Sequence, residues 1–174
     1  MTRIGLSIFL CVVPFVKDLQ AEDDPVKALE ISASAVDFAL MGVDGKTYSL
    51  KDFSGARVLA IIFTCNHCPT AQAYEGRIKK LVADYKEKGV AFVAISPNDP
   101  QAVRLDELGY TDLSDSFEEM KIRAKDRDFN FPYLYDGDTE TVARAYGPVA
   151  TPHVFIFDGA QTALRGTPRR FRAR

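Results

Sequence analysis

The stretch RVLAIIFTCNHCPTAQAYEGRIKKLVADYKEK, residues 57–88, decides the fold of this chain. It opens with an apolar run from Val58 to Phe63 that is short and rich in β-branched and aromatic residues, which is typical of a buried strand. It closes with apolar residues at helical spacing: Tyr74, Ile78, Leu81, Val82 and Tyr85. Gly89 follows as a helix stop. The pattern therefore predicts a strand, a short loop and a helix.

Two cysteines lie in the loop between this strand and this helix. Cys65 stands at the expected N-cap, where its sulfur would accept hydrogen bonds from the first amides and gain from the helix dipole. Such settings lower a thiol pKa from roughly 8.5 into the range of about 3.5–7.5, and a protonated His67 would lower it further. We therefore expect Cys65 to be the attacking thiolate. Cys68, one turn on and less exposed, would then resolve the mixed disulfide.

Length and composition describe one domain. The chain has 174 residues, of which 47% are hydrophobic and 26% charged, enough for a single core. The net charge of −2 gives no electrostatic case for a nucleic-acid partner. Three cysteines are too few for a disulfide scaffold. We expect a monomer.

Residues 1–21 have the pattern of a signal peptide. Arg3 precedes an apolar run from Ile4 to Val16, and Ala21 offers a small residue for cleavage. Pro14 interrupts the run, which is also short for a transmembrane helix, so no stable membrane span is expected after processing. A buried N-terminal strand or an uncleaved anchor is the alternative. Export would place the domain in the periplasm or outside the cell, where conditions are oxidising.

The remaining chain predicts further elements in order. Residues 22–31 form an acidic leader that we expect to be flexible, and Asp44-Gly45 predicts a hairpin turn. A second buried strand at residues 90–96 follows the central helix, which predicts a βαβ unit with parallel strands. Other expected elements are a helical turn at 49–53, a helix capped by Ser116, a strand at 131–135 and a helix from Thr139 or Thr141 to Tyr146.

A second informative site is Thr151-Pro152, directly before the apolar strand that ends at Asp158. Proline has no amide to donate, so Pro152 fits only at the first position of such a strand. A cis Thr151–Pro152 bond would turn the Thr151 backbone outward, although only about 5–6% of such bonds are cis in folded proteins.

The chain resembles the thioredoxin superfamily, in its peroxiredoxin-like branch of alkyl hydroperoxide reductase and thiol-specific antioxidant proteins, in the subset with a thioredoxin-type CxxC motif. The resemblance is carried by residues 63–69, 96–99, 116–121, 131–136 and 151–153. It implies an α/β thioredoxin-like fold over residues 32–164, with a central mixed sheet, helices on both faces and an N-terminal hairpin. It also implies that Pro152 is cis and that Thr151 and Pro152 position the partner beside the cysteines.

The chain departs from that pattern at three places. Peroxiredoxins place a proline four residues before a threonine that lies three before the reactive cysteine, whereas Ala60 lies four before Thr64, and Thr64 directly precedes Cys65. The strand at 58–63 lacks the buried acid of thioredoxins. The closing edge strand and helix look incomplete, and the arginine-rich tail at 165–174 is expected to be disordered.

These observations favour a thiol–disulfide oxidoreductase that needs no cofactor. Its partners would be protein thiols or disulfides and a redox donor or acceptor, and His67 would tune the redox properties of the pair. One alternative is a thiol peroxidase working through Cys68. Another is a copper or zinc chaperone using Cys65 and Cys68 with His153, or with His67 as well. The cysteines could also form only a structural disulfide.

Overall fold

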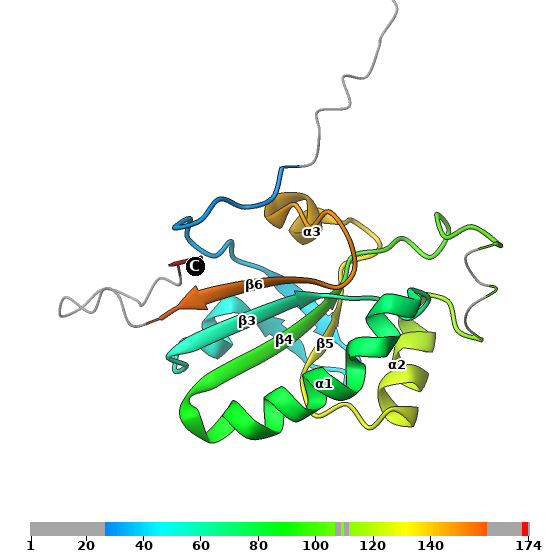
Figure 1. Cartoon of the computed structure of the whole chain (residues 1–174). Helices are drawn as coiled ribbons and strands as arrows, with labels where there is room; N and C mark the ends of the chain where they lie inside the picture. Colours follow the sequence, from blue (N-terminus) through cyan, green and yellow to red (C-terminus); the bar gives the residue numbers. More distant parts are fainter. Residues whose placement is uncertain (1–26, 107–108, 110–111, 160–171, 174) are drawn as a thin grey trace, which may run out of the picture.

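The computed structural model describes residues 27–106, 109, 112–159 and 172–173. Within these ranges, seven strands form one mixed sheet in the order β2-β1-β5-β4-β3-β6-β7 (Figure 1). Helices α1 and α2 lie on one face of the sheet, and α3 lies on the other (Figure 1). This arrangement confirms the predicted α/β architecture with helices on both faces.

The βαβ unit forms as the sequence predicts. Strands β3 (Val58–Phe63) and β4 (Val90–Ser96) pair in parallel along the whole length of β3. Helix α1 (Pro69–Tyr85) and the 3₁₀ turn η2 (Lys86–Lys88) connect them, and β5 (Tyr133–Tyr135) adds a third parallel strand beside β4. Because parallel strands end at the same edge of a sheet, the loops that follow β3 and β4 come together there.

The other predicted elements agree in kind and order: β1 (Ala39–Gly42), β2 (Thr47–Ser49), η1 (Leu50–Phe53), α2 (Phe117–Asp126), α3 (Thr141–Tyr146) and β6 (His153–Asp158). Ser116 caps α2, as expected. At α3 the N-cap is Glu140 instead of a threonine. The reason is that the buried Asp136 carboxylate accepts the N–H groups of Val142 at 3.3 Å and Ala143 at 2.7 Å, which replaces a threonine cap.

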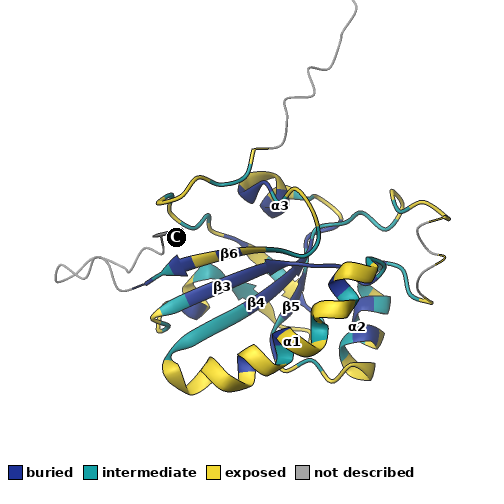
Figure 2. Ribbon diagram, in the orientation of Figure 1, coloured by how far each residue is buried: buried dark blue, intermediate teal, exposed yellow. Residues whose placement is uncertain are grey.

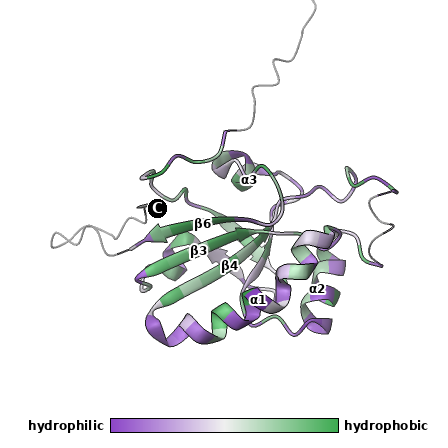
Figure 3. Cartoon of the chain, in the orientation of Figure 1, coloured by the Kyte–Doolittle hydropathy of each residue, from purple (hydrophilic) through white to green (hydrophobic). Residues whose placement is uncertain are grey.

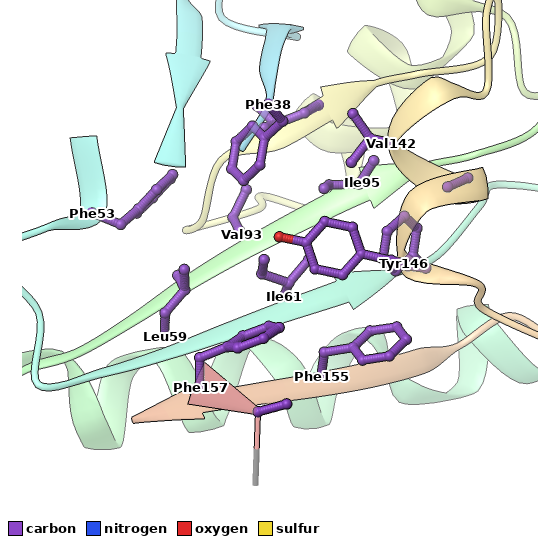
Figure 4. Close-up of a cluster of buried hydrophobic side chains, with 14 residues drawn as sticks. Phe38, Phe53, Leu59, Ile61, Val93, Ile95, Val142, Tyr146, Phe155 and Phe157 are labelled. Carbon is purple, nitrogen blue, oxygen red and sulfur yellow. The ribbon is translucent and has the colours of Figure 1, made fainter. Parts of the chain in front are cut away.

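Each face of the sheet carries its own hydrophobic cluster. On the α3 face, aromatic side chains of β3, β6 and α3 pack together, and Tyr146 contacts Phe63, Phe155 and Phe157 (Figure 4). On the opposite face, Ile78 of α1 and Met120 of α2 pack against the sheet. The strands that support the cysteine loop are therefore buried on both sides, as the dark colour of β3 shows (Figure 2).

Among the described residues, few side chains cover the α1 face next to β6. Side chains alternate along a strand, so Val154 and Ile156 point away from the α3 cluster that contains Phe155. Val154 is 50% exposed and Ile156 is 46% exposed, and Figure 3 shows β6 as a hydrophobic strand. Tyr74, Leu81 and Tyr85 of the predicted apolar stripe on α1 are also exposed.

Two residues of the predicted flexible leader, residues 22–31, make contacts with the folded domain. Leu29 donates its N–H to the carbonyl of Tyr146 at 2.8 Å, and Ala28 and Leu29 pack against the α3 cluster. The physical reason is that these two apolar side chains cover the end of α3. Residues 22–26 of the predicted leader lie outside the described residues.

The prediction that residues 165–174 are disordered is wrong at residues 172–173, the part of the tail that the structure describes. Strand β7 (Arg172–Ala173) pairs antiparallel with β6. Ala173 also donates its N–H to Ala33 at 2.8 Å. Pairing occurs because β6 otherwise presents unpaired backbone groups at the sheet edge. The missing edge strand is thus present as two residues, whereas residues 160–171 and 174 lie outside the description.

The predicted signal peptide, residues 1–21, also lies outside the described residues. Among the helices that are described, none has the length and apolar character needed to cross a membrane.

Candidate functional site

Cys68, not Cys65, occupies the N-cap of α1. The helix begins at Pro69, and Cys68 has an extended backbone with φ −72° and ψ 117°. The prediction that Cys65 caps the helix and is the more exposed cysteine is therefore wrong. The chain places the start of the helix three residues later because Pro69 fits the first helical position, where no backbone N–H is needed.

The surroundings of Cys68 favour its thiolate. Burial would raise the pKa of this partly exposed thiol, but interactions with the amides of Ala71 and Thr70 and with the side chain of Thr151 outweigh it. The pKa of Cys68 is consequently lowered from its ordinary value. As a thiol, Cys68 donates from Sγ to the backbone carbonyl of Thr151 over 3.3 Å.

Cys65 lies behind Cys68 and is buried, with only 3% of its surface exposed. Burial raises the pKa of the Cys65 thiol to about 12, and the negative charge of Asp115 adds to the effect. A hydrogen bond with Thr151 Oγ1, 3.2 Å from Sγ, opposes this rise only in part. Both cysteines are free thiols in the structure.

Thr151 joins the two cysteines to the loop before β6. Its hydroxyl contacts Cys65 and its carbonyl contacts Cys68, although the three residues come from distant parts of the sequence. The Thr151–Pro152 peptide bond is cis, as expected. The structure therefore brings together three of the predicted site residues, Cys65, Cys68 and Thr151, and Pro152 follows Thr151 in the chain.

The middle of the CxxC motif is held by buried hydrogen bonds. The Asn66 side chain donates from Nδ2 to the Ser114 carbonyl at 2.7 Å and accepts at Oδ1 from the Tyr133 hydroxyl at 3.2 Å. The Asn66 carbonyl accepts from Gln72 Nε2 at 2.7 Å. These contacts fix the loop that carries both cysteines, and they assign a role to Tyr133 that its strand pattern did not suggest.

Asp115 is the main site residue that the sequence analysis missed. Its side chain is fully buried, at 0% exposure, beside the CxxC loop. Oδ1 accepts the backbone N–H groups of Asn66 at 2.7 Å and His67 at 3.2 Å. Oδ2 lies 2.6 Å from His67 Nδ1 and accepts Asn98 Nδ2 at 2.6 Å. The sequence did contain a signal for this residue. Asn98 and Asp115 lie between β4 and α2, after a strand that ends at the edge where the parallel strands end.

His67 lies beside Asp115 and is only partly exposed. Its side chain is 17% exposed and points its Nδ1 at Asp115. It remains near the cysteines, so a tuning role stays a prediction. His67 takes this position because the motif loop folds inward onto the buried carboxylate.

A metal could be considered only at one group of described residues. Cys65, His67 and Asp115 each offer a ligand atom, and these atoms lie within 4.8 Å of one another. The two Asp115 oxygens already take part in four hydrogen bonds, which uses their accepting capacity. His153 does not belong to this group, since its Nδ1 accepts from Val149 N–H and its ring stacks on Phe155. The donor set therefore fits a metal poorly.

A cavity of about 470 Å³ opens beside the cysteine loop. Its lining includes His67 and Thr151, and also Glu140 and Arg144 of the α3 region. The apolar side chain of Val149, in the loop before Pro152, also lines the cavity and is 67% exposed. The cavity thus joins the reactive loop to a surface with apolar and charged groups.

Comparison with known proteins agrees with this geometry. Residues 31–163 match the AhpC/TSA family, which is most of the chain. The chain belongs to the AhpC/TSA family. This confirms the resemblance that the sequence motifs indicate.

Individual relatives of this AhpC/TSA chain point in the same direction. The thiol-disulfide oxidoreductase ResA of Bacillus thuringiensis is 28% identical over 158 residues, which cover 90% of this chain and 80% of ResA. A conserved protein from Geobacillus kaustophilus is 39% identical with a TM-score of 0.65, covering 74% of this chain and 64% of that protein. The thioredoxin domain of a thiol-disulfide oxidoreductase from Bacteroides vulgatus shares the fold, with a TM-score of 0.60 at 18% identity over 84% of this chain and 89% of that domain.

Proposed function

We propose that this thiol–disulfide oxidoreductase attacks with Cys68 and resolves with Cys65. The observation that carries the proposal is the contrast between the two sulfurs. Cys68 is partly exposed at the tip of α1 with a lowered pKa, whereas Cys65 is buried with a raised pKa. The sequence predicts the opposite order, and the position of the helix start supports the reversal.

The exchange then proceeds in two balanced steps. The Cys68 thiolate attacks one sulfur of a substrate disulfide, forming a mixed disulfide while the other substrate sulfur leaves as a thiolate and takes up a proton. Cys65 then loses its proton and attacks the Cys68 sulfur. The Cys65–Cys68 bond forms, and the second substrate sulfur leaves with the electron pair and is protonated. Two electrons pass from the cysteine pair to the substrate, and the reverse sequence oxidises a substrate dithiol.

Single-cysteine variants test this order. With insulin as the disulfide substrate, we expect Cys65→Ser to accumulate a mixed disulfide on Cys68, because nothing resolves it. Cys68→Ser should lose turnover and accumulate no adduct. Peptide mapping by mass spectrometry identifies the sulfur that carries the adduct. An adduct that forms through Cys65 in the Cys68→Ser variant, at a rate similar to that of Cys68, would contradict the proposed order.

The substrates that fit the site are protein thiols and disulfides. The cavity beside the loop, lined by His67 and Thr151, offers room for a segment of the partner. In this proposal Thr151 and Pro152 position that segment against Cys68, and a separate redox donor or acceptor restores the pair. The protein would act as a monomer, which sedimentation of the reduced protein tests directly.

A second candidate function is peroxide reduction, and the placement of Cys68 favours it. A thiol of lowered pKa stands directly before Pro69 and Thr70 at a helix N-terminus. The Cys68 thiolate would attack a peroxide oxygen and become a sulfenic acid as the O–O bond breaks and an alcohol or water leaves. Cys65 would then form the disulfide and release water. Comparing the rate of Cys68 sulfenic acid formation with the rate of disulfide exchange separates the two functions.

We also propose that the chain is exported, on the basis of the basic and apolar pattern of residues 1–21. Fractionation of cells that produce the full chain, with N-terminal sequencing of the recovered protein, tests this. Protein that stays in the cytosol with residues 1–21 intact would contradict it.

A further inference from the structure

Asp115 is an unusual neighbour for a pair of reactive cysteines. Its side chain is completely buried, yet it comes from the loop before α2 and from no part of the CxxC motif. An isolated carboxylate is costly to bury, so it needs compensating donors. The two amides of Asn66 and His67, the His67 ring and Asn98 surround it. These donors satisfy the buried carboxylate oxygens with hydrogen bonds.

This carboxylate affects the two cysteines unequally. A ligand atom of Asp115 lies within 4.8 Å of the Cys65 sulfur, whereas Cys68 is not part of that group. The negative charge ranks directly after burial among the causes that raise the pKa of Cys65, and it is absent from the main causes at Cys68. Two like charges this close in a buried site repel each other strongly.

Asp115 also holds the backbone between the cysteines. By accepting the N–H groups of Asn66 and His67, it draws the middle of the motif inward. The loop then turns so that Cys65 faces the interior and Cys68 reaches the first turn of α1. The same side chain therefore acts on the position of the sulfurs and on the charge next to one of them.

We propose that Asp115 is a positioning residue that makes Cys68, and not Cys65, the nucleophile of the exchange reaction. The inference rests on the function proposed above. It adds the reason why the two cysteines react in that order: the side chain that sets the order lies outside the CxxC motif. Removing its charge makes Cys65 a competing nucleophile.

Other ionisable groups near Cys65 are Cys68 from the start of α1, His67 from the motif loop and Tyr133 from β5. The Tyr133 hydroxyl donates to Asn66, and burial holds its pKa well above the ordinary value, so it stays neutral. Asp115 is consequently the group whose negative charge distinguishes the surroundings of Cys65.

The test measures alkylation of one cysteine at a time by iodoacetamide. In the Cys68→Ser background, Cys65 should react slowly, and adding Asp115→Asn should speed it about threefold or more. That factor corresponds to a pKa lower by about one unit, because the tenfold gain in thiolate is partly offset by lower nucleophilicity. In the Cys65→Ser background, the same substitution should change the rate at Cys68 by less than about twofold.

Asn98→Ala is the matched control, because it removes a neutral donor to the same Asp115 oxygen and leaves the charge. We expect this substitution not to raise the rate at which iodoacetamide alkylates Cys65. Equal acceleration by Asn98→Ala and Asp115→Asn would mean that loosening of the loop, and not charge, exposes Cys65, and would overturn the proposal. Asp115→Ala serves as a second charge-removing variant if Asp115→Asn does not fold.

Mapping the first alkylated cysteine in the reduced wild-type protein gives a measurement that depends on no variant. We expect Cys68, and preferential labelling of Cys65 would overturn the proposal. The function itself is judged separately by insulin turnover in the wild type. Turnover with an adduct trapped on Cys65 refutes the proposed order of the two cysteines and with it the role of Asp115, whereas absence of any turnover or adduct refutes the exchange function.

Discussion

Cys65 and Cys68 are three residues apart, yet their sulfurs lie in different surroundings. Cys68 interacts with the amides at the start of α1, whereas Cys65 lies near a buried carboxylate and contacts the Thr151 hydroxyl. A CxxC motif predicts that both cysteines react, but it does not determine which one ionises. That depends on where the helix begins and on Asp115, a residue distant in sequence.

The raised pKa of Cys65 predicts a pH dependence of stability. The thiol ionises near its ordinary value of 9.0 in the unfolded chain and near 12 in the folded protein. Its contribution to stability is therefore complete below pH 9.0 and is lost as the pH rises toward 12. Raising the pH through this window should shrink the difference in unfolding free energy between the reduced wild type and Cys65→Ala by up to about 1.4 kcal/mol per unit.

Chemical denaturation at several pH values measures this difference, and the comparison removes the similar contribution of tyrosines such as Tyr48 and Tyr135. A constant difference across the window would show that Cys65 ionises alike in both states.

Thr151→Val tests the contact between the Thr151 hydroxyl and Cys65. The valine keeps the backbone carbonyl that faces Cys68 and removes the hydroxyl 3.2 Å from the Cys65 sulfur. Because the Thr151 side chain also helps to lower the pKa of Cys68, the rate of attack by Cys68 is measured separately from the rate of resolution. Losing a hydrogen bond of about 1 kcal/mol that favours the Cys65 thiolate should slow resolution of the mixed disulfide roughly fivefold. Single-turnover kinetics with insulin measures this step, and Thr151→Ser should restore it. An unchanged rate would assign Thr151 a role through its backbone alone.

At the scale of elements, the sequence predicts which segments form helices and strands better than it predicts their contacts. Helix α3 ends at Gly147, which has φ 65°, and the leader crosses the chain at that point. An added Cβ at Gly147 would lie 2.1 Å from the carbonyl of Lys27. The end of α3 therefore depends on a segment that composition alone suggested was flexible.

Gly147→Ala should destabilise the protein by about 1–3 kcal/mol, because alanine is strained at positive φ and collides with the leader. Gly76 in α1 provides the matched control, since an added Cβ there meets no heavy atom within 4 Å. Gly76→Ala should stabilise by about 0.5–1 kcal/mol through helix propensity. Thermal and urea unfolding measure both, and changes of the same sign would contradict the described packing of the leader.

At the scale of the whole molecule, the described residues cover the two faces of β6 unequally. Phe155 packs in the α3 cluster at 6% exposure, whereas its neighbour Val154 is 50% exposed on the α1 face. Burial therefore alternates along β6 although all of its central residues are apolar, and the helices that cover each sheet face decide which of these residues are buried. A continuous hydrophobic run predicts burial on both faces, and β6 departs from that prediction.

Phe155→Ala should cost about 3–5 kcal/mol of stability, because it leaves a cavity among Phe63 and Tyr146. Val154→Ala, one position away on the other face, should cost less than about 1 kcal/mol, because the side chain is already half in water. Urea denaturation of the two variants provides the comparison. Similar costs at both positions would show that the α1 face is covered in solution.

Local sequence determined the order and type of the elements, the hairpin turn, the βαβ unit and the two loops that carry Cys65, Cys68 and Thr151-Pro152. These features follow from apolar periodicity, caps and turn residues within a few positions, so a single sequence contains them. The tertiary structure decided which cysteine is buried, where His67 points and that Asp115 lies beside Cys65 and His67. Those features depend on residues about fifty positions apart meeting at the edge where β3, β4 and β5 end, and the charge and burial created there exist only once the sheet has formed.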